Sequence, residues 1–272
     1  MKQTKLVEFQ ANDSLLRGIL VTPDKRRVPE NFALFLHGFE RVATSEKKFK
    51  VFADKLAVAG VASFRFDFSG CGLSEGDFSV TTVARRSFEC AAALAALEEK
   101  SFAKPVAVVA HSLGAAVLVK LLESKPEITP TALVLLAPAL NQKELLRYWF
   151  VQSFLSKQNP ETSAEWGNYR DYLDEKEFQA DCRRETRMTA VNHIGREYYL
   201  ENKEVCYRIS PAASNDRTLW IHGDADTKVP RESVQEAFIH AITVRGGNHD
   251  LERPDVFEQW IDRAVDFVAQ RT

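Results

Sequence analysis

A serine at residue 112 stands where an apolar strand is expected to give way abruptly to a helix. The run Val106–Ala110 is apolar and rich in valine, and it stops at the sequence His-Ser-Leu-Gly before a helix-forming segment begins at Ala115. This pattern predicts a strand, a tight turn and a helix, with Ser112 at the turn. A serine on such a turn holds its hydroxyl above the sheet, beside the free N–H groups of a helix start. Ser112 is therefore the candidate nucleophile.

A serine hydroxyl is barely ionised near neutral pH, so a nucleophilic serine needs a base. His249 lies in the glycine-rich loop 246–250, between an apolar strand pattern at Ala241–Val244 and an amphipathic segment at Val256–Val268. Loops at strand ends commonly carry catalytic groups, so we expect His249 to be the base. The alternative is an exposed loop histidine, with Asp250 capping the last helix.

A third group must hold that base in the right tautomer, and it is expected after a strand that lies between the serine and the histidine in sequence. The strand pattern Leu219–His222 is broken by Gly223 and followed by Asp224 and Asp226. We favour Asp226, because Gly-x-x-Asp followed by Val-Pro is the familiar spacing. Asp224 is the fallback, and a turn residue bonding to its own backbone is the ordinary interpretation of its position.

Negative charge that develops on a substrate carbonyl needs two N–H donors. One is expected from Leu113, which follows the serine, and the other from the loop after an earlier strand, Phe32–Leu36. The backbone N–H of Phe39 is the candidate in that loop, with Gly38 allowing the bend. We expect His37 to be structural and to bond to the neighbouring loop backbone.

Five short motifs occur in one order along the chain: His37–Phe39, Asp67–Ser74, Ala110–Gly114, Gly223–Asp226 and Gly247–His249. With them the chain resembles the α/β-hydrolase superfamily. It is most similar there to small capped esterases of the cinnamoyl (feruloyl) type and to serine aminopeptidase-like hydrolases. The resemblance implies hydrolysis of an ester, thioester or amide through an acyl-enzyme, and it does not identify the acyl group.

Composition agrees with a globular enzyme. The 272 residues are 45% hydrophobic and carry a formal net charge of −2, with acids and bases interspersed. Apart from the short turn Lys25–Arg27 there is no basic block, so no nucleic-acid partner is expected. Residues 1–10 lack an apolar core, and the sequence has no run of 18 apolar residues. We therefore expect a cytoplasmic protein with no membrane partner.

Four cysteines are widely spaced and form no Cys-x-x-Cys pair, so neither a zinc site nor a disulfide framework is predicted. No metal and no cofactor are expected. Cys71 lies near the expected catalytic edge, and we interpret it as a small side chain packed in a glycine turn.

The chain alternates between strand and helix patterns, which predicts a doubly wound, mostly parallel, eight-stranded sheet of the α/β class. Two alternating segments flank Asn12-Asp13 and indicate an antiparallel entry hairpin. The expected strands are Lys5–Phe9, Leu15–Val21, Ala33–Leu36, Ala62–Phe66, Val106–Ala110, Leu133–Leu136, Leu219–His222 and Ala241–Val244. The expected helices are Lys47–Ala59, Thr82–Glu98, Ala115–Ser124, Arg231–Phe238 and Val256–Ala269.

Residues 139–217 interrupt this alternation without a convincing buried strand, and a compact connection would be far shorter. We expect a mainly helical cap inserted into a core formed by residues 1–138 and 218–272. The cap contains all six tyrosines of the chain. Tyrosine and tryptophan suit a wet pocket, and Trp149, Trp166, Tyr169 and Tyr199 are the candidate substrate contacts. The alternative is that these rings only attach the cap helices to the core.

These observations predict a capped serine hydrolase, most simply a carboxylesterase for small or medium esters with an apolar or aromatic acyl part. Its partner would be a small-molecule ester, and a homodimer is possible. An aminopeptidase or a thioesterase would use the same three residues. A protein of another class, which kept the fold as a catalytically silent binding module or scaffold, is the remaining alternative.

Overall fold

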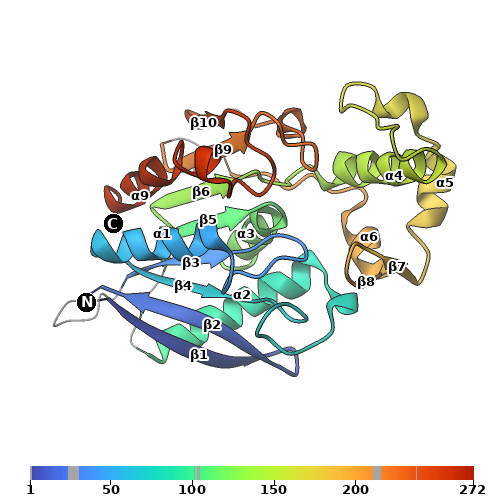
Figure 1. The fold of residues 1–272 in the computed structure, drawn as a ribbon. Coiled ribbons are helices and arrows are strands. Elements are labelled where there is room, and N and C mark those ends of the chain that lie inside the picture. Colours follow the sequence, from blue (N-terminus) through green and yellow to red (C-terminus); the bar gives the residue numbers. More distant parts are fainter. Residues whose placement is uncertain (1, 24–30, 101, 103–104, 211–215, 237) are drawn as a thin grey trace.

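The computed structural model describes residues 2–23, 31–100, 102, 105–210, 216–236 and 238–272. Its centre is an eight-stranded sheet in the order β1-β2-β4-β3-β5-β6-β9-β10 (Figure 1). The pairs β1–β2 and β2–β4 are antiparallel, and the remaining pairs, from β4–β3 to β9–β10, are parallel. The predicted sheet is confirmed, whereas the basic turn at residues 25–27 lies outside the described residues.

The chain enters through a hairpin of β1 (Gln3–Ala11) and β2 (Ser14–Thr22). Asn12 and Asp13 form its two-residue turn, and both have positive φ angles, 49° and 60°. Short polar residues tolerate this left-handed backbone, and the resulting turn matches the natural twist of the strands. The predicted entry hairpin is therefore confirmed.

Apart from the edge strand β10, the parallel strands are almost entirely buried, because helices cover both faces of the sheet. Helices α1 and α9 pack on one face, and α2 and α3 pack together on the other. These strands are β3 (Phe32–Leu36), β4 (Ala62–Phe66), β5 (Pro105–His111), β6 (Ala132–Leu136), β9 (Thr218–Gly223) and β10 (His240–Val244). The helices are α1 (Lys47–Val58), α2 (Val83–Glu98), α3 (Leu113–Ser124), α8 (Pro254–Phe257) and α9 (Ile261–Ala269), with a 3-10 turn η1 at Phe78–Val80. Within the described ranges, no helix is long and apolar enough to cross a membrane.

Two helix predictions need correction. The helix expected at residues 231–238 is wrong, because the described residues there form only a 3-10 turn, η3 (Arg231–Ser233), before the backbone extends at Val234. Phe238 instead packs its ring 5.7 Å from that of Trp220, so a tertiary contact outweighs helix propensity. The last predicted helix is divided into α8 and α9 at Trp260. This indole is fully buried and donates a hydrogen bond to the carbonyl of Leu251, 3.2 Å away.

Between β6 and β9 the chain leaves the sheet and forms a separate group of elements beyond the carboxyl ends of the strands (Figure 1). We call residues 139–217 the insertion. Its elements are α4 (Gln142–Gln158), the 3-10 turn η2 (Tyr169–Tyr172), α5 (Glu175–Asp181), β7 (Thr186–Met188), β8 (His193–Gly195) and α6 (Arg196–Asn202). It is mainly helical, and it also contains the short β7–β8 hairpin, which the sequence did not indicate.

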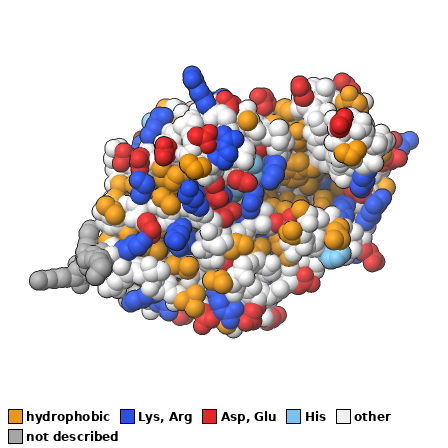
Figure 2. Space-filling view, viewed as in Figure 1, with side chains coloured by type: hydrophobic (Ala, Val, Ile, Leu, Met, Phe, Trp, Pro, Cys, Tyr) orange, Lys and Arg blue, Asp and Glu red, His pale blue; other side chains and the backbone are white. Residues whose placement is uncertain are grey.

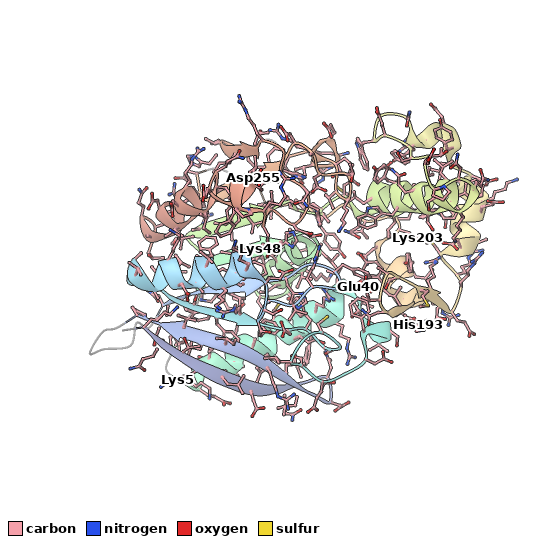
Figure 3. The ribbon with its side chains drawn as sticks, viewed as in Figure 1. Lys5, Glu40, Lys48, His193, Lys203 and Asp255 are labelled. Carbon is pink, nitrogen blue, oxygen red and sulfur yellow. The ribbon has the colours of Figure 1, made fainter. Side chains whose placement is uncertain are left out.

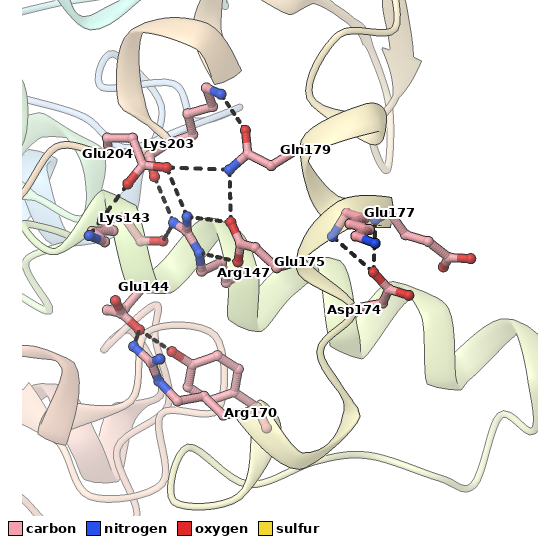
Figure 4. A network of polar contacts seen from close by, with 12 residues as sticks. Lys143, Glu144, Arg147, Arg170, Asp174, Glu175, Glu177, Gln179, Lys203 and Glu204 are labelled. Atoms are coloured by element: carbon pink, nitrogen blue, oxygen red, sulfur yellow. Dashed lines mark hydrogen bonds and ion pairs between the residues drawn. The ribbon is translucent and has the colours of Figure 1, made fainter.

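A single arginine ties the helices of the insertion together (Figure 4). Arg147 on α4 bonds to both carboxylate oxygens of Glu175 at 2.9 and 2.8 Å and to Glu204 at 2.8 Å. Its guanidinium also lies 4.6 Å from the ring centre of Phe178. Burial alone would lower the pKa of Arg147, but the bonds to the two carboxylates outweigh it and raise that pKa. Arg147 therefore links α4 to α5 and to the segment that follows α6.

Two glycines let the loops after β9 and β10 meet backbone to backbone. A Cβ atom on Gly223 would lie only 2.0 Å from the carbonyl oxygen of Gly247. That same oxygen accepts a hydrogen bond of 3.0 Å from the N–H of Ala225. The loops that carry Asp226 and His249 are thereby fixed against each other.

We therefore expect Gly223→Ala to destabilise the fold by about 1–3 kcal/mol or more, because the new methyl overlaps a backbone that cannot move aside. Thermal unfolding measures the change. Gly167→Ala is the matched control, since no atom lies within 4 Å of a Cβ at that position. Equal melting temperatures for the two variants would contradict this account of the contact.

Candidate active site

Ser112 occupies a strained turn between β5 and α3. Its backbone angles are φ 54° and ψ −120°, in a region that non-glycine residues rarely adopt. Gly114 makes the turn possible, because a Cβ there would lie 2.5 Å from the carbonyl oxygen of Leu36. Gly38 faces the serine itself, and a Cβ on Gly38 would lie 2.9 Å from the Cβ of Ser112. The predicted strand–turn–helix at Ser112 is present, and strain at such a turn is common at functional sites.

The structure brings the three predicted residues into one hydrogen-bonded line. The hydroxyl oxygen of Ser112 lies 2.9 Å from Nε2 of His249. On the other side of the ring, Nδ1 lies 2.8 Å from Oδ2 of Asp226. All three residues are buried, with 6–7% of their surface exposed. This geometry can take a proton from the serine hydroxyl and stabilise the imidazolium that results.

Asp226 rather than Asp224 makes the contact with His249. Asp226 accepts the backbone N–H groups of Lys228 and Val229 at 3.0 and 2.9 Å through its second oxygen. Asp224 is exposed and accepts the N–H of Gly246 at 2.7 Å, so it ties the two loops together from outside.

A second histidine, His222, also contacts the buried carboxylate. Its Nδ1 accepts the indole N–H of Trp220 at 3.1 Å, so the ring proton is placed on Nε2. That nitrogen lies 2.8 Å from the carbonyl of Val229 and 3.3 Å from Oδ2 of Asp226. Burial by itself raises the pKa of Asp226, but the hydrogen bonds from His222 and His249 outweigh burial and hold that pKa well below its usual range. Asp226 is therefore a stable anion at neutral pH.

The loop that carries His249 is fixed by groups from three other elements. His111 is buried and donates from Nε2 to the carbonyl of His249 at 2.9 Å. Next in the loop, Asp250 pairs with Arg41. Glu252 accepts the backbone N–H of Lys48 at 3.1 Å, and the buried ammonium of Lys48 lies 3.4 Å from the same carboxylate (Lys48 is labelled in Figure 3).

The peptide group between Gly38 and Phe39 is held in a fixed orientation from its carbonyl side. His37 accepts the N–H of Phe68 on Nε2 at 3.0 Å, so Nδ1 carries the proton and donates to the Gly38 carbonyl at 2.8 Å. Burial lowers the pKa of His37 well below its ordinary value, which keeps the ring neutral. Arg86 donates to the same carbonyl at 3.1 Å. As predicted, His37 bonds to the loop backbone.

A trans peptide points its N–H opposite to its carbonyl, so these two donors also orient the N–H of Phe39. Within the described part of the chain, that N–H has no protein acceptor. The N–H of Leu113 is the first of α3 and has no partner inside the helix. Among the described residues neither predicted donor has an acceptor, and a negatively charged oxygen is the group that such donors favour.

A cavity of about 1240 Å³ opens beside Ser112 and His249 and extends under the insertion. Figure 2 shows this hollow between the insertion and the core, with hydrophobic side chains inside it and basic side chains at its edges. Its apolar lining consists of Phe39, Leu146, Trp149, Phe150, Phe154, Phe178, Met188, Ala180, Ala190, Val191, Tyr198, Tyr199 and Val229. Its charged lining consists of Glu40, Arg41, Lys157, Glu177, Asp181, Arg184, Arg187 and Lys228.

Two of the four predicted aromatic contacts line this cavity and two do not. Trp149 and Tyr199 are on its wall, and the indole N–H of Trp149 donates to the carbonyl of Lys228 at 2.6 Å. Trp166 and Tyr169 are not among the residues that line it, so this cavity does not support the expectation that they contact substrate. Their rings lie 5.2 Å apart and pack against Tyr148 in a cluster within the insertion, and Trp166 also packs against a cluster that includes the core residue Val229.

Sequence reasoning missed Arg86 and His222 as parts of the site. The signal for His222 was its place at the end of a buried strand next to the favoured aspartate. Arg86 gave no signal, because it lies on α2, outside the five motifs, and only the packing of that helix brings it to the Gly38 carbonyl. Cys71 is buried with its sulfur 3.9 Å from Arg86, and burial raises the pKa of its thiol. No group of three His, Cys, Asp or Glu side chains that could hold a metal is found among the described residues.

Comparison with known proteins gives one family and many similar folds. The sequence profile described as "Serine aminopeptidase, S33" matches residues 28–249. No curated protein matches the chain by sequence.

Three solved structures illustrate the similarity of fold. Est1E from Butyrivibrio proteoclasticus, with ferulic acid bound, has a TM-score of 0.69 and 17% identity, over 97% of this chain and 98% of that one. Alpha/beta hydrolase domain-containing protein 10 from mouse has a TM-score of 0.65 and 17% identity, over 98% and 100%. An esterase from Pyrococcus furiosus has a TM-score of 0.62 and 19% identity, over 98% and 91%. The fold is that of α/β hydrolases.

The low pKa of Asp226 leads to an expectation about acid stability. A carboxyl whose pKa is depressed in the folded protein stabilises it above about pH 4, the ordinary aspartate range, and loses that contribution as the pH falls through the folded pKa. The free energy of unfolding of the natural protein should therefore fall more steeply below pH 4 than that of Asp226→Asn.

Urea unfolding followed by tryptophan fluorescence at pH 7, 5 and 3 measures this difference. Asp224→Asn is the control, because that side chain is exposed and its amide keeps an acceptor for Gly246. Parallel pH dependences for the natural protein and Asp226→Asn would show that the buried carboxylate does not contribute in this way.

Proposed function

Because the chain belongs to the serine aminopeptidase S33 family of α/β hydrolases, we propose that it is a serine hydrolase, and specifically a carboxylesterase. The observation that carries the proposal is the buried line from Ser112 through His249 to Asp226, with contacts of 2.9 and 2.8 Å. Two backbone N–H groups support it, on Phe39 in the loop after β3 and on Leu113 at the start of α3, because neither has an acceptor among the described residues.

In the proposed reaction, Oγ of Ser112 attacks the ester carbonyl while Nε2 of His249 takes the hydroxyl proton. Asp226 stabilises the imidazolium through Nδ1. The N–H groups of Phe39 and Leu113 bind the oxygen as it becomes negative. His249 then gives its proton to the leaving alcohol, and the acyl group remains on the serine. Water, activated by the same histidine, releases the acid.

The substrate proposed is a small or medium ester with an apolar or aromatic acyl part. Aromatic and aliphatic side chains of the insertion form much of the cavity wall, which suits an apolar or aromatic acyl group. The likeness to Est1E, whose structure holds ferulic acid, agrees with an aromatic acyl group.

The family description favours an aminopeptidase as the second candidate. A free amino terminus would need a carboxylate in the cavity that is not already occupied. Glu40 is engaged by Thr189 and Asn192, and Asp181 lies 2.8 Å from the guanidinium of Arg187. Glu177 also lines the cavity, and among the described residues no side-chain partner is found for its exposed carboxylate, so it is the group that a free amine would use in the aminopeptidase alternative.

The nucleophile can be tested by covalent labelling. An alkyl fluorophosphonate should label one serine and abolish hydrolysis of p-nitrophenyl butyrate, and Ser112→Ala should lose both the label and at least about four orders of magnitude in kcat. Intact-mass spectrometry and steady-state kinetics measure the two effects. A protein that stays unlabelled and inactive would instead be a silent binding module, and labelling that survives Ser112→Ala would move the nucleophile elsewhere.

The cavity wall should set acyl preference. Trp149→Ala and Tyr199→Ala should each change the relative kcat/KM for acetyl, butyryl, octanoyl and cinnamoyl esters by roughly 10- to 200-fold, since each removes apolar wall worth about 1–3 kcal/mol per methylene-sized contact. Trp166→Ala is the control, because Trp166 is an aromatic residue of the insertion that is not among the residues lining the cavity. If all three variants keep the natural ranking of substrates, the wall residues do not determine specificity.

A further inference from the structure

The loop that carries the Phe39 N–H is bonded on its far side to the insertion. Glu40 follows Phe39 directly, and its Oε1 accepts hydrogen bonds from the hydroxyl of Thr189 and from the side-chain amide of Asn192, the latter at 3.0 Å. Thr189 and Asn192 form the turn between β7 and β8. Figure 3 labels Glu40 and His193, which begins β8, where this hairpin meets the core.

The backbone of Glu40 is strained. Its φ angle is 51°, in the left-handed region, where a residue other than glycine, asparagine or aspartate is uncommon. Such a conformation persists only where the surroundings hold it in place. The two hydrogen bonds from the hairpin supply such a restraint at the position next to the proposed donor.

The hairpin is itself firmly built, so it can act as a fixed support. The N–H of Thr189 bonds to the carbonyl of Asn192 at 2.8 Å, and the N–H of Asn192 bonds back to the hydroxyl of Thr189 at 3.0 Å. At the other end of β8, Gly195 packs against the core, since a Cβ there would lie 2.9 Å from the carbonyl oxygen of Ser79.

A second contact links the same loop to the insertion. The ring of Phe39 lies 5.3 Å from that of Tyr198 on α6 and 5.1 Å from that of Phe78 in the core. The hydroxyl of Tyr198 donates to Gln142 at the start of α4 at 3.0 Å. The loop is therefore held between the core, which fixes the Gly38 carbonyl, and the insertion, which fixes the residues after it.

We propose that the β7–β8 hairpin, acting through Glu40, positions the Phe39 N–H that binds the oxyanion. The insertion then contributes to the chemical step as well as to the substrate wall. This inference rests on the serine hydrolase function proposed above. Glu40 is a positioning residue, because it acts through the backbone of its neighbour.

A positioning role differs from a substrate-binding role in its kinetics. Glu40 lines the cavity, so a binding role would alter KM for long acyl groups that reach it. A misplaced oxyanion donor instead lowers kcat for every ester, including an acetyl ester too short to fill the cavity under the insertion. The acetyl ester is therefore the decisive substrate.

The experiment is a double-mutant cycle of Glu40→Ala and Asn192→Ala, with p-nitrophenyl acetate and octanoate as substrates. On the acetate, Glu40→Ala should lower kcat about 10- to 100-fold with KM changed less than about threefold, since displacing a donor costs less than the 10²–10³ of removing one. Asn192→Ala should lower kcat about three- to tenfold, and the double variant should be no slower than Glu40→Ala alone.

Two further variants separate positioning from general damage. Glu40→Gln keeps the acceptor oxygen for Thr189 and Asn192, so it should restore kcat to within about threefold of the natural protein. Asn159→Ala is the matched control, because that residue caps another turn of the insertion through the N–H of Glu161 and lies outside the cavity lining. Melting temperatures of all variants are measured alongside.

Hydrogen exchange of the peptide spanning residues 36–45 gives a readout that needs no catalysis. It should become faster in Glu40→Ala and Asn192→Ala and stay unchanged in Asn159→Ala. Unchanged hydrogen exchange in Glu40→Ala and Asn192→Ala overturns the inference, and so does a kinetic effect that is confined to a higher KM for the octanoate. In either case, labelling of Ser112 by the fluorophosphonate would leave the hydrolase proposal standing. A natural protein that is neither labelled nor active overturns both.

Discussion

The buried carboxylate of Asp226 is the group on which the arrangement of the site depends. A charge with a fully buried side chain is costly unless hydrogen bonds compensate it, and here the compensation comes from two histidines and two backbone N–H groups. These donors belong to β9, to the loop after it and to the loop after β10. The backbone contact of Gly223 with Gly247 is what brings the two loops close enough to supply them. Asp224 is nearer to the strand in sequence, but it is exposed and accepts the N–H of Gly246, so it links the same two loops at the protein surface.

The two sides of the proposed oxyanion site are built by different means. On one side, the strained turn at Ser112 presents a helix N–H, and the turn is held by close packing of Gly114 and Gly38 and by backbone hydrogen bonds of Ser112. On the other side, an irregular loop has to present the Phe39 N–H, and a loop peptide can rotate. Two donors on the Gly38 carbonyl, from His37 and Arg86, oppose that rotation. Their burial strengthens the restraint, because an unpaired carbonyl there would be costly.

The insertion and the core are linked at the loops that would perform the chemistry. The N–H of Ala139, the first residue of the insertion, bonds to the carbonyl of Ser112 at 3.1 Å, and the hairpin turn bonds to Glu40. The cavity lies between these attachments and is walled by both parts. The same segment that shapes the space for a substrate therefore also contacts the backbone groups that would stabilise its reaction.

The sequence by itself determined the eight strands of the main sheet, the entry hairpin and the turn at Ser112. It also gave the candidates Ser112, His249 and Asp226. Each of these depends on local pattern, namely apolar runs, glycines at turns and polar residues at strand ends, whereas the short strands β7 and β8 carry no such pattern. It failed at residues 231–238, where the contact of Phe238 with Trp220 overrides helix propensity. Only the tertiary structure decided that Trp149 and Tyr199 face the cavity while Trp166 and Tyr169 do not, and that Arg86, His222 and Glu40 support the site. Those assignments depend on packing between segments far apart in the chain, and local periodicity carries no information about which face meets which neighbour.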